Sequence, residues 1–175
     1  MKYWLLCLII FISCNKGHEI KSEIESFLGS TVVMTKDIEN KIEEFFPEKK
    51  YFLLIYLENK ECMPCKLEKV DMLKHYKSDF DKFYTGIALI IQDGDKKDER
   101  REDVRFLLKE AGMDYPIIFD ENDEFIKNNK AISNKLCRTF IVDKDKKVIW
   151  IGSPIQNEKS MTRYRRMMFL LNLFH

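Results

Sequence analysis

Residues 61–68 read Glu-Cys-Met-Pro-Cys-Lys-Leu-Glu and place two cysteines three positions apart, with a proline between them. The motif follows Tyr51–Leu57, a continuous apolar run of strand length. It opens a segment, residues 63–77, whose apolar residues recur at helical intervals. A Cys-x-x-Cys pair where a strand passes into a helix is typical of redox-active dithiols, so this stretch guides the prediction of both fold and chemistry.

The elements around this motif predict an α/β fold. Helical and strand-like patterns alternate, which favours parallel strands with helical crossovers, and a closing hairpin adds antiparallel strands to the same sheet. A charged loop at residues 92–103 leads into a helix that ends at Gly112. The expected helices are 37–46, 63–77, the helix ending at Gly112, a short one at 122–129, and 158–174; the expected strands are 51–57, 84–91, 115–119, 138–142 and 147–151.

Length and composition indicate one domain with its own core. The chain has 175 residues, of which 45% are hydrophobic, so folding need not depend on disulfides. Charged residues make up 34% of the chain, but the formal net charge is only +1. This balance gives no indication of nucleic acid as a partner.

The N-terminus has the pattern of an export signal. After Lys2, residues 4–12 are apolar, which fits the hydrophobic region of a signal peptide and is too short to span a bilayer. Ser13-Cys14 resembles the end of a bacterial lipoprotein lipobox. We therefore expect a signal peptide at 1–13, a lipidated Cys14 with a tether at 14–29, and a domain at 30–175. The alternative is an uncleaved apolar N-terminus or a buried first strand.

This interpretation places the domain outside the cytoplasm, anchored by lipid to a bacterial membrane. Of the five cysteines, three then remain in the folded part of the chain: Cys62, Cys65 and Cys137. Disulfides persist in that compartment, so a redox pair with one further thiol is chemically consistent with it.

The spacing of Cys62 and Cys65 suits thiol–disulfide exchange. A cysteine at a helix N-terminus has a lowered pKa, so Cys62 is the expected nucleophile. Cys65 lies one turn further along the same face and is the expected resolving thiol. A zinc site would need further ligands, and the sequence contains no second Cys-x-x-Cys. Two structural thiols are the other alternative.

Two blocks of this sequence resemble the TlpA/ResA-type thioredoxin-like proteins, which are membrane-tethered thiol-disulfide oxidoreductases. Residues 62–68 match that family's C-x-P-C-K-x-E signature, and residues 139–149, TFIVDKDKKVI, are similar to its later strand and turn. The resemblance implies a thioredoxin-like three-layer fold with a mixed central sheet flanked by helices. It also implies that Glu68 lies near the cysteines, where a carboxylate could handle protons. The alternative for Glu68 is a surface ion pair.

The sequence departs from that family at two places. Glu61 replaces the usual tryptophan before the first cysteine, and an acid there should raise the pKa of Cys62. The family's cis-proline position falls at Cys137 or Arg138, with no proline nearby. Either residue would then contact substrate, and Cys137 could trap substrate, form an alternative disulfide or complete a Cu(I) site. The alternative is that Cys137 is a small buried residue.

These observations support three functions. The first is an envelope thiol-disulfide oxidoreductase that acts on cysteine pairs of other proteins or on a redox partner, as a monomer and without metal or another cofactor. The second is a redox-inactive binding or scaffold module, as the two departures suggest. The third is a carrier of copper or another soft metal bound by Cys62, Cys65 and Cys137.

Overall fold

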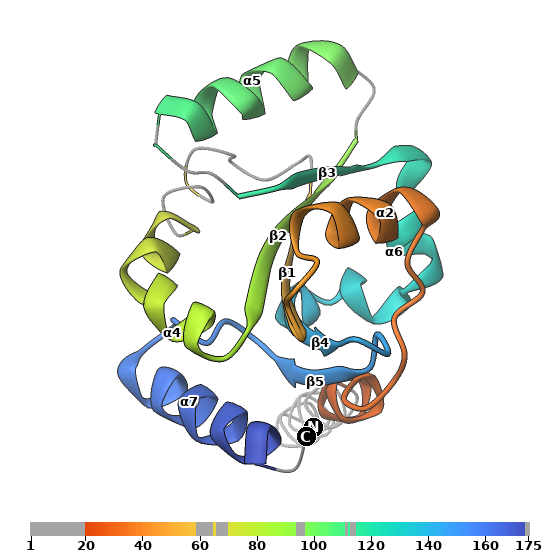
Figure 1. The fold of residues 1–175 in the computed structure, drawn as a ribbon. Helices are drawn as coiled ribbons and strands as arrows, with labels where there is room; N and C mark the ends of the chain where they lie inside the picture. Colours follow the sequence, from red (N-terminus) through yellow and green to blue (C-terminus); the bar gives the residue numbers. More distant parts are fainter. Residues whose placement is uncertain are drawn as a thin grey trace, which may run out of the picture.

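The computed structural model describes residues 20–58, 65, 70–93, 97–110, 112 and 115–173. A five-stranded sheet in the order β3-β2-β1-β4-β5 runs through the molecule (Figure 1). The strands β1, β2 and β3 are parallel, whereas β4 is antiparallel to both β1 and β5. This confirms the predicted α/β fold with a mixed sheet. The strands are β1 Tyr51–Leu57, β2 Thr85–Gln92, β3 Ile117–Asp120, β4 Thr139–Asp143 and β5 Val148–Ile151.

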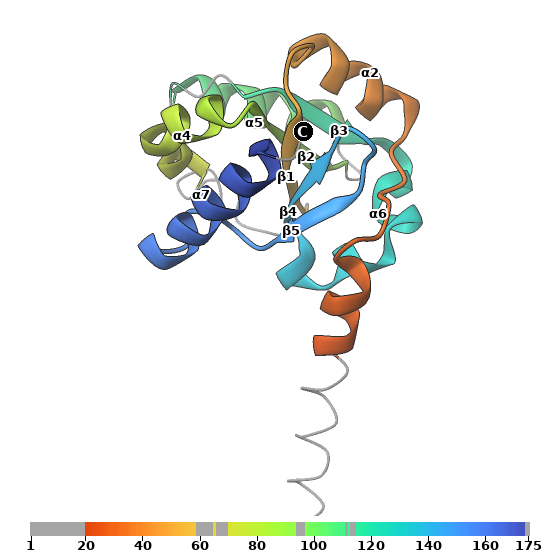
Figure 2. The same ribbon diagram turned by 60° about the horizontal axis from the view of Figure 1, so that its bottom comes forward.

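Helices cover both faces of the sheet, which gives three layers (Figures 1 and 2). The helices α4, α5 and α7 pack on one face, whereas α2, α6 and the helical residues 20–27 pack on the other. The α-helices are α2 Lys36–Phe45, α4 Lys77–Lys82, α5 Lys97–Glu110, α6 Glu124–Asn128 and α7 Glu158–Leu173; the 3₁₀ turns are η1 Met72–Tyr76, η2 Glu121–Asp123, η3 Lys130–Ser133 and η4 Lys135–Cys137.

The central strands explain the continuous apolar runs in the sequence. Successive side chains of a strand point to opposite faces of the sheet. In β1, Leu53 and Ile55 enter the core under α4, α5 and α7, whereas Leu54 and Tyr56 enter the core under α2 and α6. Because both faces are covered, almost every residue of β1 and β2 is buried.

Residues before position 30 also pack against the domain expected at 30–175. Residues 20–27 are helical, and Phe27 is buried with its ring edge-on to Phe140 at a centroid distance of 5.2 Å. The backbone N–H of Gly29 also donates to the carbonyl of Val148 over 2.8 Å. The last part of the expected tether is therefore part of the packed structure. The expected signal peptide and Cys14 lie outside the described residues.

The helix predicted at 63–77 continues further than its apolar pattern indicated. Residues 70 and 71 are helical, the 3₁₀ turn η1 follows, and α4 extends the helical segment to Lys82. Phe80 is fully buried in α4 and packs against Tyr164 of α7 at 5.2 Å between ring centroids. The predicted helix ended too early because only one aromatic residue, Phe80, packs the last turn into the core, and its neighbours in the sequence are polar.

The methionine-bearing face of α7 packs in the core. Met161, Tyr164 and Met168 are fully buried beneath this helix. The hydroxyl of Tyr164 lies 2.9 Å from Thr85 Oγ1, which satisfies both polar groups inside the core. Burial accordingly raises the pKa of Tyr164 above its ordinary value.

A close approach at Gly86 yields a stability prediction. A Cβ added at this position would lie 2.8 Å from the ring of Phe46, which follows the last turn of α2. We expect Gly86→Ala to lower the free energy of unfolding by about 1–2 kcal/mol, because the ring must leave its place over β2. Urea denaturation of the two proteins measures this cost.

A double-mutant cycle with Phe46→Ala assigns the cost to this contact. Without the ring, Gly86→Ala should cost less than about 0.5 kcal/mol. An equal cost with and without Phe46 would contradict the proposed clash.

Candidate active site

Cys65 is the one motif residue among those the structure describes. Its backbone is helical, its side chain is exposed, and its sulfur is part of a disulfide. Cys137 is a free thiol and so is not its partner, which lies outside the described residues. Cys62 and Glu68 also lie outside the described residues, so their predicted roles remain predictions.

A cavity of about 170 Å³ lies where β1 ends and the segment after the motif packs against the sheet. It is lined by residues of β1 and residues that follow the motif, together with the segment before β4 and the one after β5. The cavity thus joins chain segments that are far apart in sequence, next to the strand that leads into the motif. Its lining includes Leu57, Val70, Leu73, Ile155, Lys135, Arg138, Thr139 and Ser153.

Arg138, which lines this cavity, joins the segment before β4 to the end of β1. Only 6% of the residue is exposed, and its guanidinium forms an ion pair with Glu58, the residue directly after β1. It also donates to the carbonyls of Ile132 and Ser133, each over 3.3 Å. Its own carbonyl accepts from the N–H of Tyr56 over 2.7 Å. Arg138 therefore fixes the segment before β4 against the end of β1, next to a region where we expected substrate contact.

Cys137 takes a different place from its neighbour. The thiol is fully buried at the end of η4 and packs in the core beneath α2 and α6. Desolvation, with a smaller effect of Glu23, raises the pKa of Cys137 and favours the unreactive thiol. This is the small buried residue of the alternative interpretation. Val70 and Leu73, which follow the motif, belong to the core on the other face.

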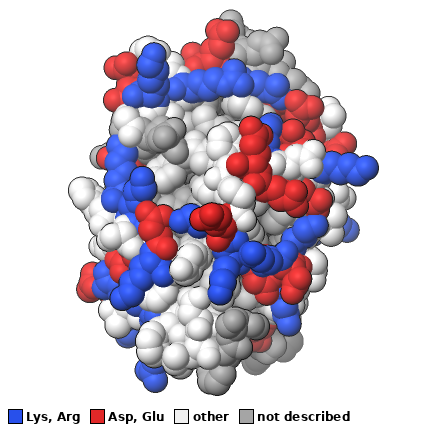
Figure 3. Space-filling model, in the orientation of Figure 1, with Lys and Arg blue, Asp and Glu red and all other residues white. Residues whose placement is uncertain are grey.

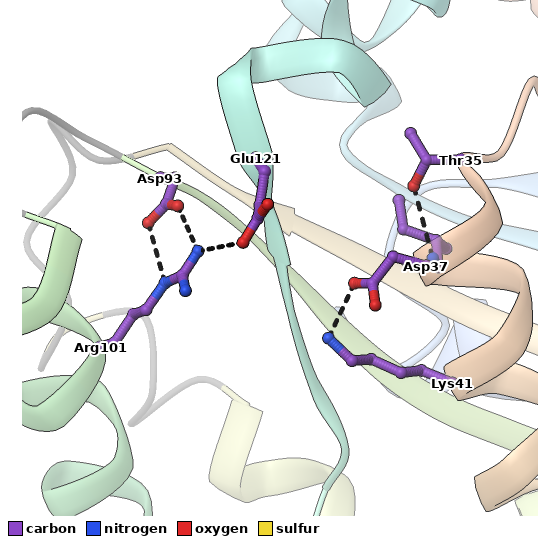
Figure 4. A network of polar contacts seen from close by, with 7 residues as sticks. Thr35, Asp37, Lys41, Asp93, Arg101 and Glu121 are labelled. Atoms are coloured by element: carbon purple, nitrogen blue, oxygen red, sulfur yellow. Dashed lines mark hydrogen bonds and ion pairs between the residues drawn. The ribbon is translucent and has the colours of Figure 1, made fainter.

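The ends of β2 and β3 are joined by an arginine from α5 (Figure 4). Arg101 contacts both carboxylate oxygens of Asp93, which follows β2, and donates to Glu121 Oε1 over 2.8 Å. Its guanidinium lies 4.8 Å from the ring centroid of Phe119. The contact of Arg101 was not predicted from the sequence, because this residue lies in a charged run that is typical of a solvated loop. In the described part of the chain, no group of three or more His, Cys, Asp or Glu side chains is arranged to hold a metal.

A second polar contact lies beneath the sheet on the α6 side. Asp120 is almost completely buried and accepts from Tyr56 over 3.2 Å and from the N–H of Phe125 over 2.7 Å. It also accepts from the N–H of Ile126 over 3.2 Å and so holds the start of α6. Burial nevertheless raises the pKa of Asp120, because desolvation outweighs these hydrogen bonds.

The raised pKa of Asp120 predicts how stability depends on pH. Because the folded protein binds this proton more tightly than the unfolded chain, ionisation of Asp120 costs stability at neutral pH. That cost falls as the pH drops through the raised pKa towards the ordinary value of 3.8. Asp120→Asn cannot ionise, so its stability relative to the parent should be greatest near pH 7 and decrease on acidification. Urea denaturation at a series of pH values measures this difference, and a difference independent of pH would contradict the assignment.

The sheet order, the helices on both faces and a cysteine shortly after β1 define a thioredoxin-like fold. The chain belongs to the AhpC/TSA family, to which its residues 12–151 match. Members of this family are typically thiol-based redox enzymes. The family match supports what the sequence resemblance implied in general terms, namely that the chain is a thioredoxin-like redox protein.

Two solved structures support the same fold. The thioredoxin domain of a thiol-disulfide oxidoreductase from Bacteroides vulgatus is similar with a TM-score of 0.55 and 16% identity, over 81% of this chain and 97% of that one. A thiol:disulfide interchange protein from Bacteroides sp. gives a TM-score of 0.51 and 16% identity, over 78% of this chain and 86% of that one. A hypothetical protein from Sinorhizobium meliloti 1021 gives 0.47 and 18% identity, and the match spans 63% of this chain and 59% of that one. No curated protein matches the chain.

Proposed function

We propose that this protein is a thiol-disulfide oxidoreductase of the cell envelope that acts on cysteine pairs of other proteins. The observation that carries the proposal is the disulfide at Cys65, whose side chain is exposed and therefore within reach of a visiting protein. Cys65 stands five positions before Val70, which lines the cavity beside β1. We assign Cys62 as the disulfide partner of Cys65.

The proposed reaction is a two-electron exchange. The thiolate of Cys62 attacks a substrate disulfide, forms a mixed disulfide, and releases one substrate sulfur as a thiolate that takes a proton. The thiolate of Cys65 then attacks the Cys62 sulfur and releases the second substrate thiol. The substrate is thereby reduced by two electrons, and Cys62 and Cys65 are oxidised to a disulfide. An external dithiol must reduce this disulfide before the next cycle, and the reverse sequence oxidises a substrate.

Two further assignments belong to this proposal. Glu68 accepts the proton of Cys65 when that thiol becomes the attacking group. Lipidation of Cys14 keeps the domain at the outer side of a bacterial membrane. The lipobox-like Ser13-Cys14 and the apolar run before it support the anchor. No helix among the described residues is long and apolar enough to cross a bilayer.

Insulin reduction tests the proposed activity. A chain of residues 20–175 suits the assay, because every core side chain among the described residues lies between residues 24 and 171. With dithiothreitol as the reductant, this chain should accelerate the precipitation of insulin. The Cys62→Ser variant, which lacks the proposed nucleophile, should not. Equal rates with and without the protein would instead favour a redox-inactive binding module.

The thiol pKa of Cys62 gives an independent test. A working nucleophile at a helix N-terminus should titrate below about 7.5 when alkylation is followed against pH. A value close to that of free cysteine, about 8.5, would contradict the proposed activation.

A further inference from the structure

The outward face of α7 carries large apolar side chains that do not contact the core. Met161, Tyr164 and Met168 turn towards the sheet, so the opposite side of the helix faces solvent. On that side Phe169, Leu170 and Leu173 are 57%, 46% and 61% exposed. The helix lies along the lower edge of the molecule in Figure 1. In Figure 3, broad uncharged surface is visible at this end, bordered by lysine and arginine side chains.

The exposed leucines of α7 form one straight stripe together with basic residues of the same helix. Successive residues of an α-helix turn by about 100°, so Lys159, Arg163, Arg166, Leu170 and Leu173 fall within about 80° of arc. The stripe is about 21 Å long, since each residue rises about 1.5 Å. Its first half is basic and its second half is apolar, with Phe169 at the edge of the apolar half. We call it the α7 stripe.

The basic residues of the α7 stripe have no ionic partner within the described part of the chain. Arg165, which lies on the side of the helix, contacts Asp79 through two nitrogens and also pairs with Glu158. No ion pair joins Arg163 or Arg166 to a described carboxylate. Arg165 therefore serves the fold, whereas the charges of the stripe are available to a partner.

We propose that the α7 stripe docks on an anionic lipid surface. The arginines would contact lipid phosphates, and the leucines and Phe169 would enter the boundary between head groups and acyl chains. Positive charge faces negative phosphate, and the exposed apolar side chains leave water in the same step. This binding needs neither the redox pair nor a lipid on Cys14.

The shape of the stripe favours a lipid surface over a protein. A stable protein interface needs about 1,000 Å² with matching shape, and a single convex helix face offers much less. A bilayer surface adapts to a convex helix and supplies many phosphates along its length. Basic residues combined with large apolar ones are characteristic of helices that lie in a membrane interface.

Vesicle co-sedimentation tests this proposal with residues 20–175, which lack the apolar N-terminal run. The protein should bind vesicles of equal parts phosphatidylglycerol and phosphatidylcholine, and bind much less to phosphatidylcholine alone. Arg163→Gln with Arg166→Gln should lower the partition coefficient about 30-fold, since each basic residue near the surface contributes about 1 kcal/mol. Leu170→Ser with Leu173→Ser should lower it at least about tenfold.

Matched variants on other faces are the controls. Lys36→Gln with Lys109→Gln removes the same charge from exposed positions on α2 and α5, and Phe106→Ser removes an exposed aromatic side chain from α5. These should leave binding within about twofold of the parent. Failure of the parent to bind anionic vesicles would overturn the proposal, as would an equal loss in the control variants. A dimer in light scattering that dissociates with Leu170→Ser and Leu173→Ser would also overturn it, because the face would then join two copies.

Insertion of the apolar half gives an independent readout. A tryptophan introduced by Phe169→Trp should shift its emission to shorter wavelength on addition of anionic vesicles. An unchanged spectrum together with sedimentation would mean that only the charges are engaged, and the proposed docking geometry would be wrong.

Discussion

The Cys65→Ser protein should form a mixed disulfide with its substrate and then stop. In the proposed cycle, Cys65 resolves this intermediate from within the same molecule, which corresponds to a very high effective concentration of thiol. Well-oriented intramolecular reactions reach effective molarities on the order of 10⁵ M, so millimolar dithiothreitol cannot replace the missing thiol. Multiple-turnover insulin reduction should therefore fall at least about 1,000-fold. Non-reducing gels and mass spectrometry should show the covalent adduct at Cys62.

Two variants distinguish this mechanism from other uses of the thiols. Cys62→Ser should give neither turnover nor adduct, because the nucleophile is absent. Cys137→Ser should keep nearly the full rate, since that thiol is buried in the core beneath α2 and α6. Adduct formation by Cys62→Ser through Cys65 would reverse the assigned order of attack, and loss of turnover in a folded Cys137→Ser protein would bring the third thiol back into the mechanism.

Arg138→Ala should be the most destabilising single change at the candidate site. The guanidinium is buried with Glu58 and also satisfies the carbonyls of Ile132 and Ser133. Its removal takes one ion-pair partner from a half-buried carboxylate and one hydrogen-bond donor from each of two carbonyls. Removing one member of a buried ion pair commonly costs 3–5 kcal/mol, and because Glu58 is partly exposed we expect about 3 kcal/mol. Chemical denaturation gives the change in the free energy of unfolding.

A double variant separates the ion pair from the other contacts of Arg138. Arg138→Met with Glu58→Gln removes both charges and should recover at least about 1 kcal/mol relative to Arg138→Ala. Lys135→Gln is the matched control, because Lys135 lines the same cavity but is exposed, and it should change stability by less than about 0.5 kcal/mol. If Arg138→Ala were as mild as Lys135→Gln, the ion pair would not hold the cavity together.

The fold was predictable because its central strands carry strong patterns. The run Tyr51–Leu57 matches β1 residue for residue, and the predicted antiparallel hairpin corresponds to β4 and β5. The end of α5 followed from Gly112, whose φ of +60° is a conformation that glycine adopts readily. Such features depend on residues close together in the chain, which is why the sequence alone reveals them.

The contacts of the candidate site were harder to predict because they join distant positions. Arg138 and Glu58 are 80 residues apart, and each looked like one more surface charge in a chain with many. Phe27 likewise lay in a stretch that its polar neighbours assigned to the tether, although its ring packs on Phe140. A single sequence contains no record of which charges or rings meet. Cys137 and Arg138 show the same limit, since adjacent residues turn to a core and to a cavity.

Because Phe27 packs the helical residues 20–27 against the domain, the linker between Cys14 and the domain is short. Even fully stretched, the linking residues up to position 20 span no more than about 20 Å. Under the proposed anchoring, the dithiol would reach only the region directly next to the bilayer. Proteins that expose their cysteines close to the lipid head groups would then be substrates. Proteins that diffuse freely at a greater distance from the bilayer would rarely contact the dithiol.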